Sequence, residues 1–207
     1  MNEKLVYSDI FKAAWKAMIS QIWLLVGLLI GFTIIISLLI LFAIPAKGET
    51  ISISGILVLF ISLLFGGLFF LGYLRNCLQT LDSEEPQFQA YGQVARRLFS
   101  FLISYIFFTV ITSIGLALFI FPGVYLFLRL QFFFAAMVDE DAGPIASFKR
   151  SWAITKGQAS QLFILMLIQL LLSFIGVITL CIGFFAAFPL ITLLYGHTFR
   201  KLIAPVA

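Results

Sequence analysis

Arg129 is the residue of this 207-residue chain whose type and position most clearly suggest chemistry. It stands inside a long apolar stretch, seven residues after Pro122 and ten before Asp139. If that stretch crosses a membrane, a charge within it costs from about 3 to more than 10 kcal/mol and requires a partner. No acidic residue falls inside an apolar stretch, so no ion pair within a span can be predicted. The partner is then a neutral polar group, water or an anion.

The amides of Gln131 and Gln169 are the candidate polar contacts of Arg129, because both stand in apolar stretches and carry donors and acceptors. Two interpretations of this set stay open. In one, Arg129 with the two amides binds an anionic lipid headgroup or another anionic ligand. In the other, Arg129 is a structural residue that is satisfied within the protein or reaches toward the membrane surface.

The acidic triplet 139–141 and the single histidine give weaker evidence of chemistry than Arg129 does. Carboxylates suit hard cations, but three consecutive acids point in different directions, and negative charge is favoured ahead of a helix that begins at Pro144. We therefore predict helix capping rather than a metal site. His197 has no acid near it in sequence, and no nucleophile motif is present. The sequence predicts no catalytic residue, metal or cofactor, and a protein that is not an enzyme.

The composition places these residues in a membrane protein. Hydrophobic residues make up 62% of the chain and charged residues 11%, against about 45–50% and about 25% in soluble domains. An excess of this size indicates that lipid surrounds much of the surface. The net charge of +4 does not indicate nucleic acid, because Lys and Arg in a membrane protein report orientation and no nucleic-acid-binding motif is present.

Several apolar runs are close to the length of about 20 residues that a spanning helix needs. They predict an all-α, polytopic protein that forms one domain over residues 1–207. Only a few residues separate the third run from the fourth and the fifth from the sixth, which predicts tight helical hairpins. The six transmembrane helices are therefore predicted to form three hairpins. Their predicted ranges are 21–43, 54–74, 98–121, 124–138, 161–181 and 183–199.

The distribution of basic residues predicts the orientation. Eleven Lys and Arg residues fall before the first span, after the last span or in the loops on that side, and Lys47 alone falls on the other. The positive-inside rule then places both termini in the cytoplasm. We expect a multi-pass protein of a bacterial or archaeal cytoplasmic membrane.

A short amphipathic helix is predicted at the cytoplasmic entry to each hairpin. Residues 11–15 read FKAAW and residues 148–152 read FKRSW, each shortly before an apolar run. In the first helix Phe11 and Trp15 share a face with Ala14 and Met18, and in the third Ile145, Phe148 and Trp152 share one. Such helices lie in the headgroup layer, where aromatic and basic residues hold them. The predicted interfacial anchors are Trp15, Lys12, Trp152, Lys149 and Arg150.

The recurrence of these helices predicts a threefold repeat over residues 1–80, 81–140 and 141–207, although an aromatic belt beside ordinary spans would leave a similar pattern. Gly27 and Gly31 form a GxxxG motif, which lets helix backbones approach closely. It predicts packing inside the bundle, with a homodimer as the alternative.

The run from Pro122 to Gly157 resembles a known family. Its characteristic positions include Arg129, Gly143-Pro144, the stretch FKRSW and Lys156-Gly157. This run is similar to the membrane domain attached to some glycerophosphoryl diester phosphodiesterases and to the YciC-like inner-membrane proteins of bacteria. The resemblance is sharpest over residues 120–160 and implies a polytopic membrane protein. It does not imply the phosphodiesterase activity, because the catalytic barrel with its metal site is absent here.

These observations predict a non-enzymatic integral membrane protein that organises the membrane, the envelope or its lipids, or that acts as the membrane partner of another protein. Its expected partners are anionic lipid headgroups and a membrane protein or a second copy of the chain. The alternative is a small transporter or lipid-handling channel that uses Arg129.

Overall fold

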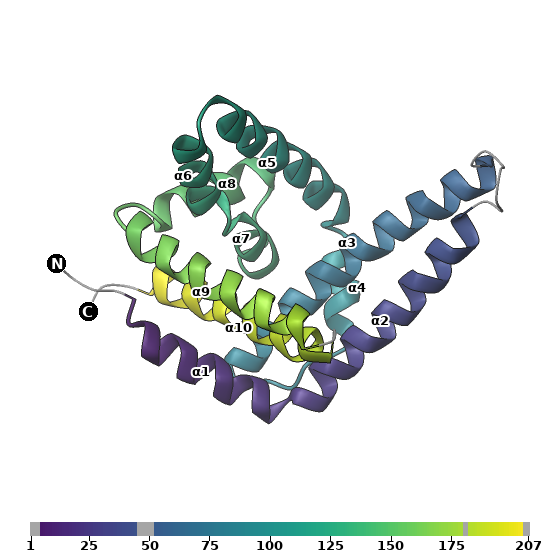
Figure 1. The fold of residues 1–207 in the computed structure, drawn as a ribbon, viewed down its shortest axis with the longest axis horizontal. Coiled ribbons are helices and arrows are strands. Elements are labelled where there is room, and N and C mark those ends of the chain that lie inside the picture. Colours follow the sequence, from purple (N-terminus) through teal and green to yellow (C-terminus); the bar gives the residue numbers. More distant parts are fainter. Residues whose placement is uncertain (1–4, 45–51, 180–181, 205–207) are drawn as a thin grey trace.

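The computed structural model describes residues 5–44, 52–179 and 182–204, and within these ranges the chain is helical and contains no strand (Figure 1). The all-α prediction is therefore confirmed for the described residues. The helices are α1 (Tyr7–Ser20), α2 (Ile22–Ala43), α3 (Ile53–Leu81), α4 (Gln89–Ala95), α5 (Leu98–Leu118), α6 (Ile120–Leu130), α7 (Phe133–Asp139), α8 (Pro144–Ile154), α9 (Ala159–Ile178) and α10 (Ile182–Ile203).

Five segments of the described chain are long and apolar enough to cross a membrane. They are α2, α3, α5, the segment Ile120–Asp139 that comprises α6 and α7, and α9. These helices are compatible with a multi-pass membrane protein. The sixth predicted span corresponds to α10 and is not among the five.

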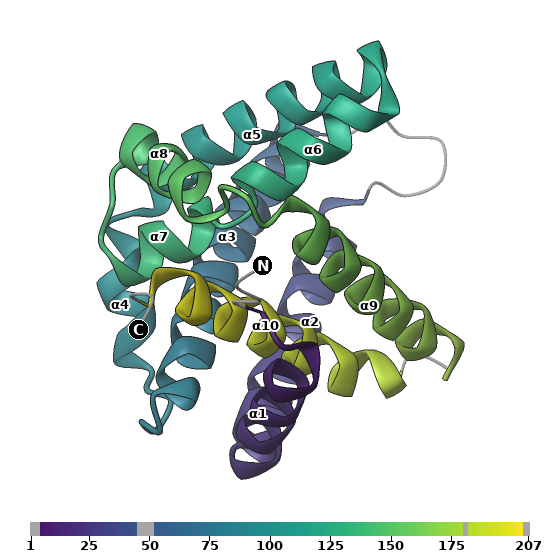
Figure 2. The same ribbon diagram turned by 90° about the vertical axis from the view of Figure 1, so that its left-hand side faces the viewer.

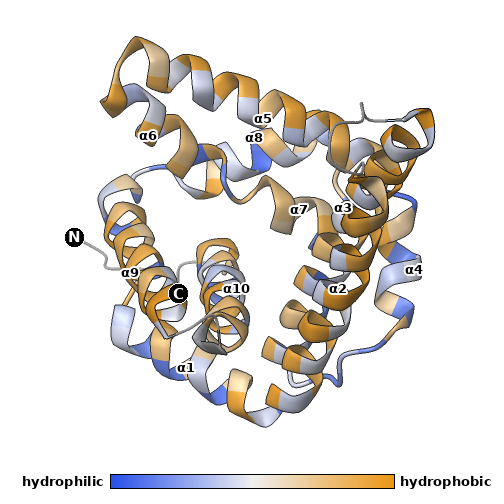
Figure 3. Cartoon of the chain, turned by 45° about the vertical axis from the view of Figure 1, so that its right-hand side comes forward, coloured by the Kyte–Doolittle hydropathy of each residue, from blue (hydrophilic) through white to orange (hydrophobic). Residues whose placement is uncertain are grey.

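The long helices pack in antiparallel pairs that follow one another along the chain. Helix α2 packs along α3, α5 along α6, and α9 along α10 (Figures 1 and 2). A shorter helix precedes each pair, namely α1, α4 and α8. In Figure 3 the hydrophobic colours dominate α2, α3, α5 and α9, whereas hydrophilic colours gather on α1, α4 and the ends of the long helices.

The core lies where the second half of α3 meets α7 and α10. Large buried side chains of this region include Tyr73, Leu74, Phe133 and Phe199. The first half of α3 is largely exposed, as are the outer parts of α2 and α5. The exposed apolar residues of these helices would face lipid, which is the solvent that favours them.

Helices α1 and α8 turn different kinds of face to the rest of the protein. In α1 the buried residues are Ile10, Ala14 and Met18, because α10 packs on this side, and Phe11 and Trp15 stay exposed beside it. The buried residues of α8, Ser147 and Ser151, form a small polar face that Thr155 at the end of the helix extends. The aromatic side chains of α8 separate. Phe148 packs on Phe133 with 4.6 Å between the ring centroids, and Trp152 is exposed over 42% of its surface.

The turn between α5 and α6 lies earlier than Pro122-Gly123, where the sequence predicted it. The chain is extended at Phe119 (φ −159°, ψ 144°), and Pro122 lies in the first turn of α6. The first turn tolerates proline because its N–H groups need no intrahelical acceptor. Gly123 is needed for packing instead, because a Cβ built there would lie 2.5 Å from the backbone nitrogen of Leu116 on α5.

The GxxxG motif is not used for close packing within the described chain, contrary to the prediction. A Cβ built on Gly27 or Gly31 would meet no atom within 4 Å. Both glycines line an apolar groove of about 590 Å³ between α2 and α3, which Phe88 and Tyr91 close on one side.

Candidate functional site

The apolar segment that contains Arg129 is broken near its middle. Helix α6 ends at Leu130 and α7 begins at Phe133, so Gln131 and Phe132 interrupt the regular helix. A break of this kind frees backbone groups that must find partners in an apolar environment. The side chains that supply those partners come from α8 and α10.

Ser151 on α8 and Thr155, which follows the helix, satisfy one side of the break. The Ser151 hydroxyl donates to the carbonyl oxygen of Arg129 (2.8 Å) and accepts from the backbone N–H of Phe132 (3.1 Å). The Thr155 hydroxyl also lies within 3.2 Å of the Arg129 carbonyl oxygen. These bonds explain why α8 buries its polar face.

Tyr195 on α10 satisfies the other side. Its hydroxyl donates to the carbonyl oxygen of Gln131 (2.8 Å) and accepts from the backbone N–H of Ala135 (3.4 Å). The break is therefore held by α8 and α10 together.

The side chain of Arg129 is buried without a carboxylate. The residue is 3% exposed, and its guanidinium carbon lies 4.3 Å from the ring centroid of Trp152 and 5.9 Å from that of Tyr125. Among the described residues no acid forms an ion pair with it, and its Nε is buried without a hydrogen-bond acceptor. Two exposed aromatic rings thus flank a guanidinium with unused donors.

The two predicted amide contacts do not hydrogen-bond to Arg129. The Gln131 side chain donates from Nε2 to the carbonyl oxygen of Leu128 at 3.3 Å. The Nε2 of Gln169 is buried without an acceptor among the described residues. Arg129 therefore meets the aromatic rings of Trp152 and Tyr125, which the sequence did not single out as its contacts.

The predicted anchors lie at the surface. Lys12, Lys149 and Arg150 are exposed, and Trp15 is exposed over 45% of its surface while it stacks on Phe11. Trp152 combines this exposure with its contact to Arg129.

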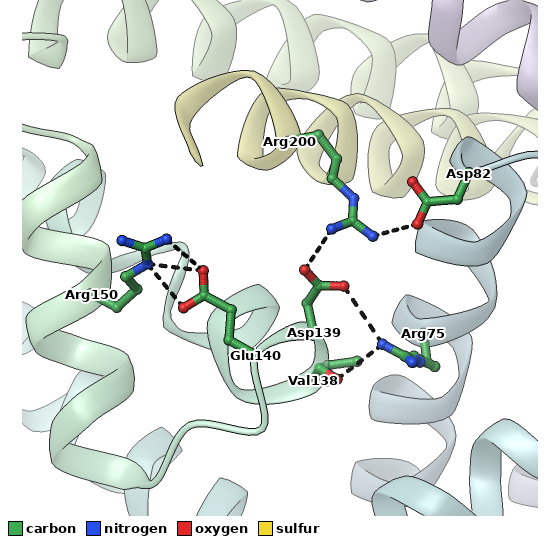
Figure 4. Close-up of polar contacts among 7 residues, drawn as sticks. All are labelled: Arg75, Asp82, Val138, Asp139, Glu140, Arg150 and Arg200. Atoms are coloured by element: carbon green, nitrogen blue, oxygen red, sulfur yellow. Dashed lines mark hydrogen bonds and ion pairs between the residues drawn. The ribbon is translucent and has the colours of Figure 1, made fainter. Parts of the chain in front are cut away.

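The acidic triplet forms ion pairs with arginines from several helices (Figure 4). Asp139 accepts from Arg200 Nη1 on α10 (2.6 Å) and lies 3.6 Å from Arg75 Nη1 on α3. Arg200 also pairs with Asp82 at the end of α3, and Arg75 donates to the carbonyl oxygen of Val138 (3.4 Å). Asp139 therefore ties α3 and α10 to the end of α7.

The other two acids of the triplet reach different partners. Glu140 accepts from Arg150 Nε on α8 at 2.9 Å, and Asp141 accepts from Arg97 Nε at 2.6 Å. The hydrogen bond from Arg97 lowers the pKa of Asp141 below its ordinary value. The contribution of this pair to stability is thus present at neutral pH and disappears only as the pH falls through that lowered pKa.

The capping prediction for the triplet is corrected by these contacts. Helix α8 begins at Pro144 after Gly143, and no side chain caps it. We use the name ionic layer for the residues Arg75, Asp82, Arg97, Asp139, Glu140, Asp141, Arg150 and Arg200. The sequence signal that could have revealed the ionic layer was the run of three acids in a chain with only nine, together with arginines at the ends of the apolar runs.

Comparison with known proteins gives no family assignment. No family model, curated protein or solved structure matches the chain, so the resemblance seen over residues 120–160 stays a prediction.

Proposed function

We propose that this chain is a non-enzymatic, multi-pass protein of a bacterial or archaeal cytoplasmic membrane that binds an anionic lipid headgroup at Arg129 and so organises lipid around it. Its six spans form three hairpins, each entered through a helix that lies at the cytoplasmic surface. The observation that carries the proposal is the burial of Arg129 within an apolar segment, where none of the described residues gives it a carboxylate partner.

Energies support an anion at this position. A cation over an aromatic ring gains about 0.5–2 kcal/mol, whereas a charge inside a membrane-spanning helix costs at least about 3 kcal/mol. The two rings of Trp152 and Tyr125 together gain about 1–4 kcal/mol, which offsets only part of a cost that can exceed 10 kcal/mol. A lipid phosphate can accept two parallel hydrogen bonds from the planar guanidinium and remove the remainder.

The ionic layer supports the orientation. Arg75, Arg97, Arg150 and Arg200 belong to segments far apart in the sequence, and all four pair with acids within residues 139–141 or with Asp82. These ion pairs can form only if all four arginines lie on the same side of the membrane. The positive-inside rule makes that side cytoplasmic.

Transport is the second candidate, and the interrupted helix favours it. Broken helices form substrate sites in transporters, where unwound backbone carbonyls remain free to coordinate. Here Ser151, Thr155 and Tyr195 bind the carbonyl oxygens of Arg129 and Gln131. Because these backbone groups are already bound, lipid organisation remains the first proposal.

The test measures bound lipid in the Arg129→Lys and Arg129→Leu variants. Both variants should express and fold, yet retain less anionic lipid than the parent protein in native mass spectrometry. Lysine should fail because its ammonium lacks the planar fork. Lys156→Leu is the matched control, since it removes an exposed charge just after the end of α8. Unchanged anionic lipid in both Arg129 variants would refute the proposal.

A further inference from the structure

A polar pocket, which has no part in the proposed function, opens between three elements. It has a volume of about 410 Å³ and is formed by α1, the end of α3 with the residues that follow it, and α10. Lys16, Glu84 and His197 line it, one from each element. The hydroxyl of Thr80 is bound to the carbonyl oxygen of Asn76 within α3 and is not available to a ligand.

The three ionisable side chains of the pocket are unpaired. Within the part of the chain that the structure describes, none of them forms an ion pair or a side-chain hydrogen bond. Lys16 and Glu84 are exposed, and His197 is half-buried. By contrast, the arginines of the ionic layer, including Arg200 three residues from His197, have acidic partners. The pocket thus keeps one ammonium, one imidazole and one carboxylate free around a common space.

The pocket lies at a boundary between polar and apolar chain. Ser20 and Gln21 on its wall join α1 to α2, and α2 begins at Ile22 as a run of apolar residues. On the opposite wall Leu81 ends α3, and polar residues follow it. A group bound here would lie beside the ends of two candidate spans, α2 and α3. This position is at the level of the lipid headgroups.

We propose that this pocket binds a phosphate ester that carries a primary amine, the chemistry of a phosphoethanolamine group. Lys16 pairs with the phosphate, and the imidazole of His197 donates a hydrogen bond to it in either protonation state. Glu84 accepts from the ammonium group. Two sources share this chemistry, the headgroup of phosphatidylethanolamine and a free glycerophosphoethanolamine. The site is separate from Arg129 and does not depend on it.

The experiment compares lipids that differ only at the amine. The full chain is reconstituted with equal amounts of phosphatidylethanolamine and phosphatidylcholine, and native mass spectrometry measures which lipid the protein retains. Phosphatidylcholine carries the same phosphate, but its trimethylated amine cannot donate a hydrogen bond to Glu84. A charge-assisted hydrogen bond corresponds to about a tenfold difference in affinity, so phosphatidylethanolamine should be retained about tenfold better.

Paired variants identify the residues responsible. Glu84→Gln should remove the preference for phosphatidylethanolamine, and Lys16→Ala should lower retention of both lipids about tenfold. The matched controls are Glu85→Gln and Lys156→Ala. Both controls remove exposed charges that lie outside the pocket lining, and they should leave retention unchanged.

Two further arms separate the outcomes. Millimolar glycerophosphoethanolamine that displaces phosphatidylethanolamine would identify the free ester as the ligand, and absence of displacement would identify the lipid. Arg129→Leu should keep the preference for phosphatidylethanolamine, which makes this test independent of the Arg129 proposal. Equal retention of the two lipids by the parent protein, or equal losses in the control and pocket variants, would overturn the inference.

Discussion

Arg129 makes distinct contacts through its backbone and through its side chain. Its carbonyl oxygen accepts a hydrogen bond from Ser151 and lies 3.2 Å from the Thr155 hydroxyl, which fixes the end of α6 against α8. This arrangement holds the guanidinium over the ring of Trp152, which is also on α8. The position of the charge is thus set by hydrogen bonds to the backbone, and an incoming phosphate would meet a side chain that is already oriented.

Ser151→Ala should destabilise the protein by about 1–3 kcal/mol, because the buried N–H of Phe132 loses its acceptor and Thr155 can replace only part of the bond to Arg129. Thermal unfolding in detergent measures the change. Ser160→Ala is the control, since Ser160 is exposed at the start of α9. A melting temperature equal to that of the control would show that the hydroxyl does not hold the break.

The acids of the triplet should differ in their contribution to stability. The Asp139 side chain is only 10% exposed and meets two arginines. Asp139→Asn should cost about 1–3 kcal/mol, because Arg75 loses its carboxylate while Arg200 keeps only Asp82. Glu140→Gln should cost less than about 1 kcal/mol, because its pair with Arg150 is more exposed. The free energy of unfolding of both variants checks this order, and a larger effect at Glu140 would contradict it.

Glycines at the tips of two helix pairs allow close approach of the paired helices. Gly115 and Gly123 face each other across the contact between α5 and α6, where a Cβ on Gly115 would lie 3.0 Å from the Cα of Gly123. Gly176 has the same position between α9 and α10, where an added Cβ would lie 2.9 Å from the Cβ of Ala187. Small residues at such contacts provide the van der Waals packing that holds helices together in lipid.

Gly123→Ala should destabilise the protein by about 1–3 kcal/mol, because the added methyl group would overlap the backbone of α5 and force the two helices apart. Gly27→Ala is the matched control on α2. It adds the same methyl group into open space, so it should leave the melting temperature of the monomer nearly unchanged. Equal losses in the two variants would show that the close contact between α5 and α6 contributes little.

At the scale of the whole molecule, the helix pairs meet at the ionic layer and leave their outer parts exposed. Helix α3 connects the two regions. Its 29 residues correspond to about 44 Å, against about 30 Å for the hydrocarbon layer. The apolar first half can therefore lie in lipid while the last turns, which begin at Arg75, reach the ionic layer. The predicted span 54–74 ends at this transition.

The orientation predicts the behaviour of fusion proteins. A phosphatase that is active only in the periplasm should stay inactive when fused after the last residue, because the positive-inside rule places the C-terminus in the cytoplasm. The same phosphatase inserted beside Lys47, a residue outside the described ranges, should be active. Enzyme assays on intact cells give the result, and the reverse pattern would overturn the orientation.

The sequence alone predicted the approximate extent of five long apolar helices, which are compatible with a multi-pass membrane protein. An apolar run of sufficient length has few alternatives to a spanning helix, and five such segments were found near their predicted ranges. It also identified Arg129 as an unusual residue, because a charge within an apolar run is costly in lipid.

Only the tertiary structure decided which residues meet. The burial of Ser151, the face of α1 toward α10 and the pairing of Asp139 with Arg75 and Arg200 all depend on helices distant in sequence. Periodicity shows that a helix has distinct faces but not which neighbour covers each one. The break after Leu130 is likewise hidden in an apolar run, because hydroxyls from α8 and α10 satisfy the freed backbone groups. Such contacts are long-range, and the periodicity of the local sequence does not specify them.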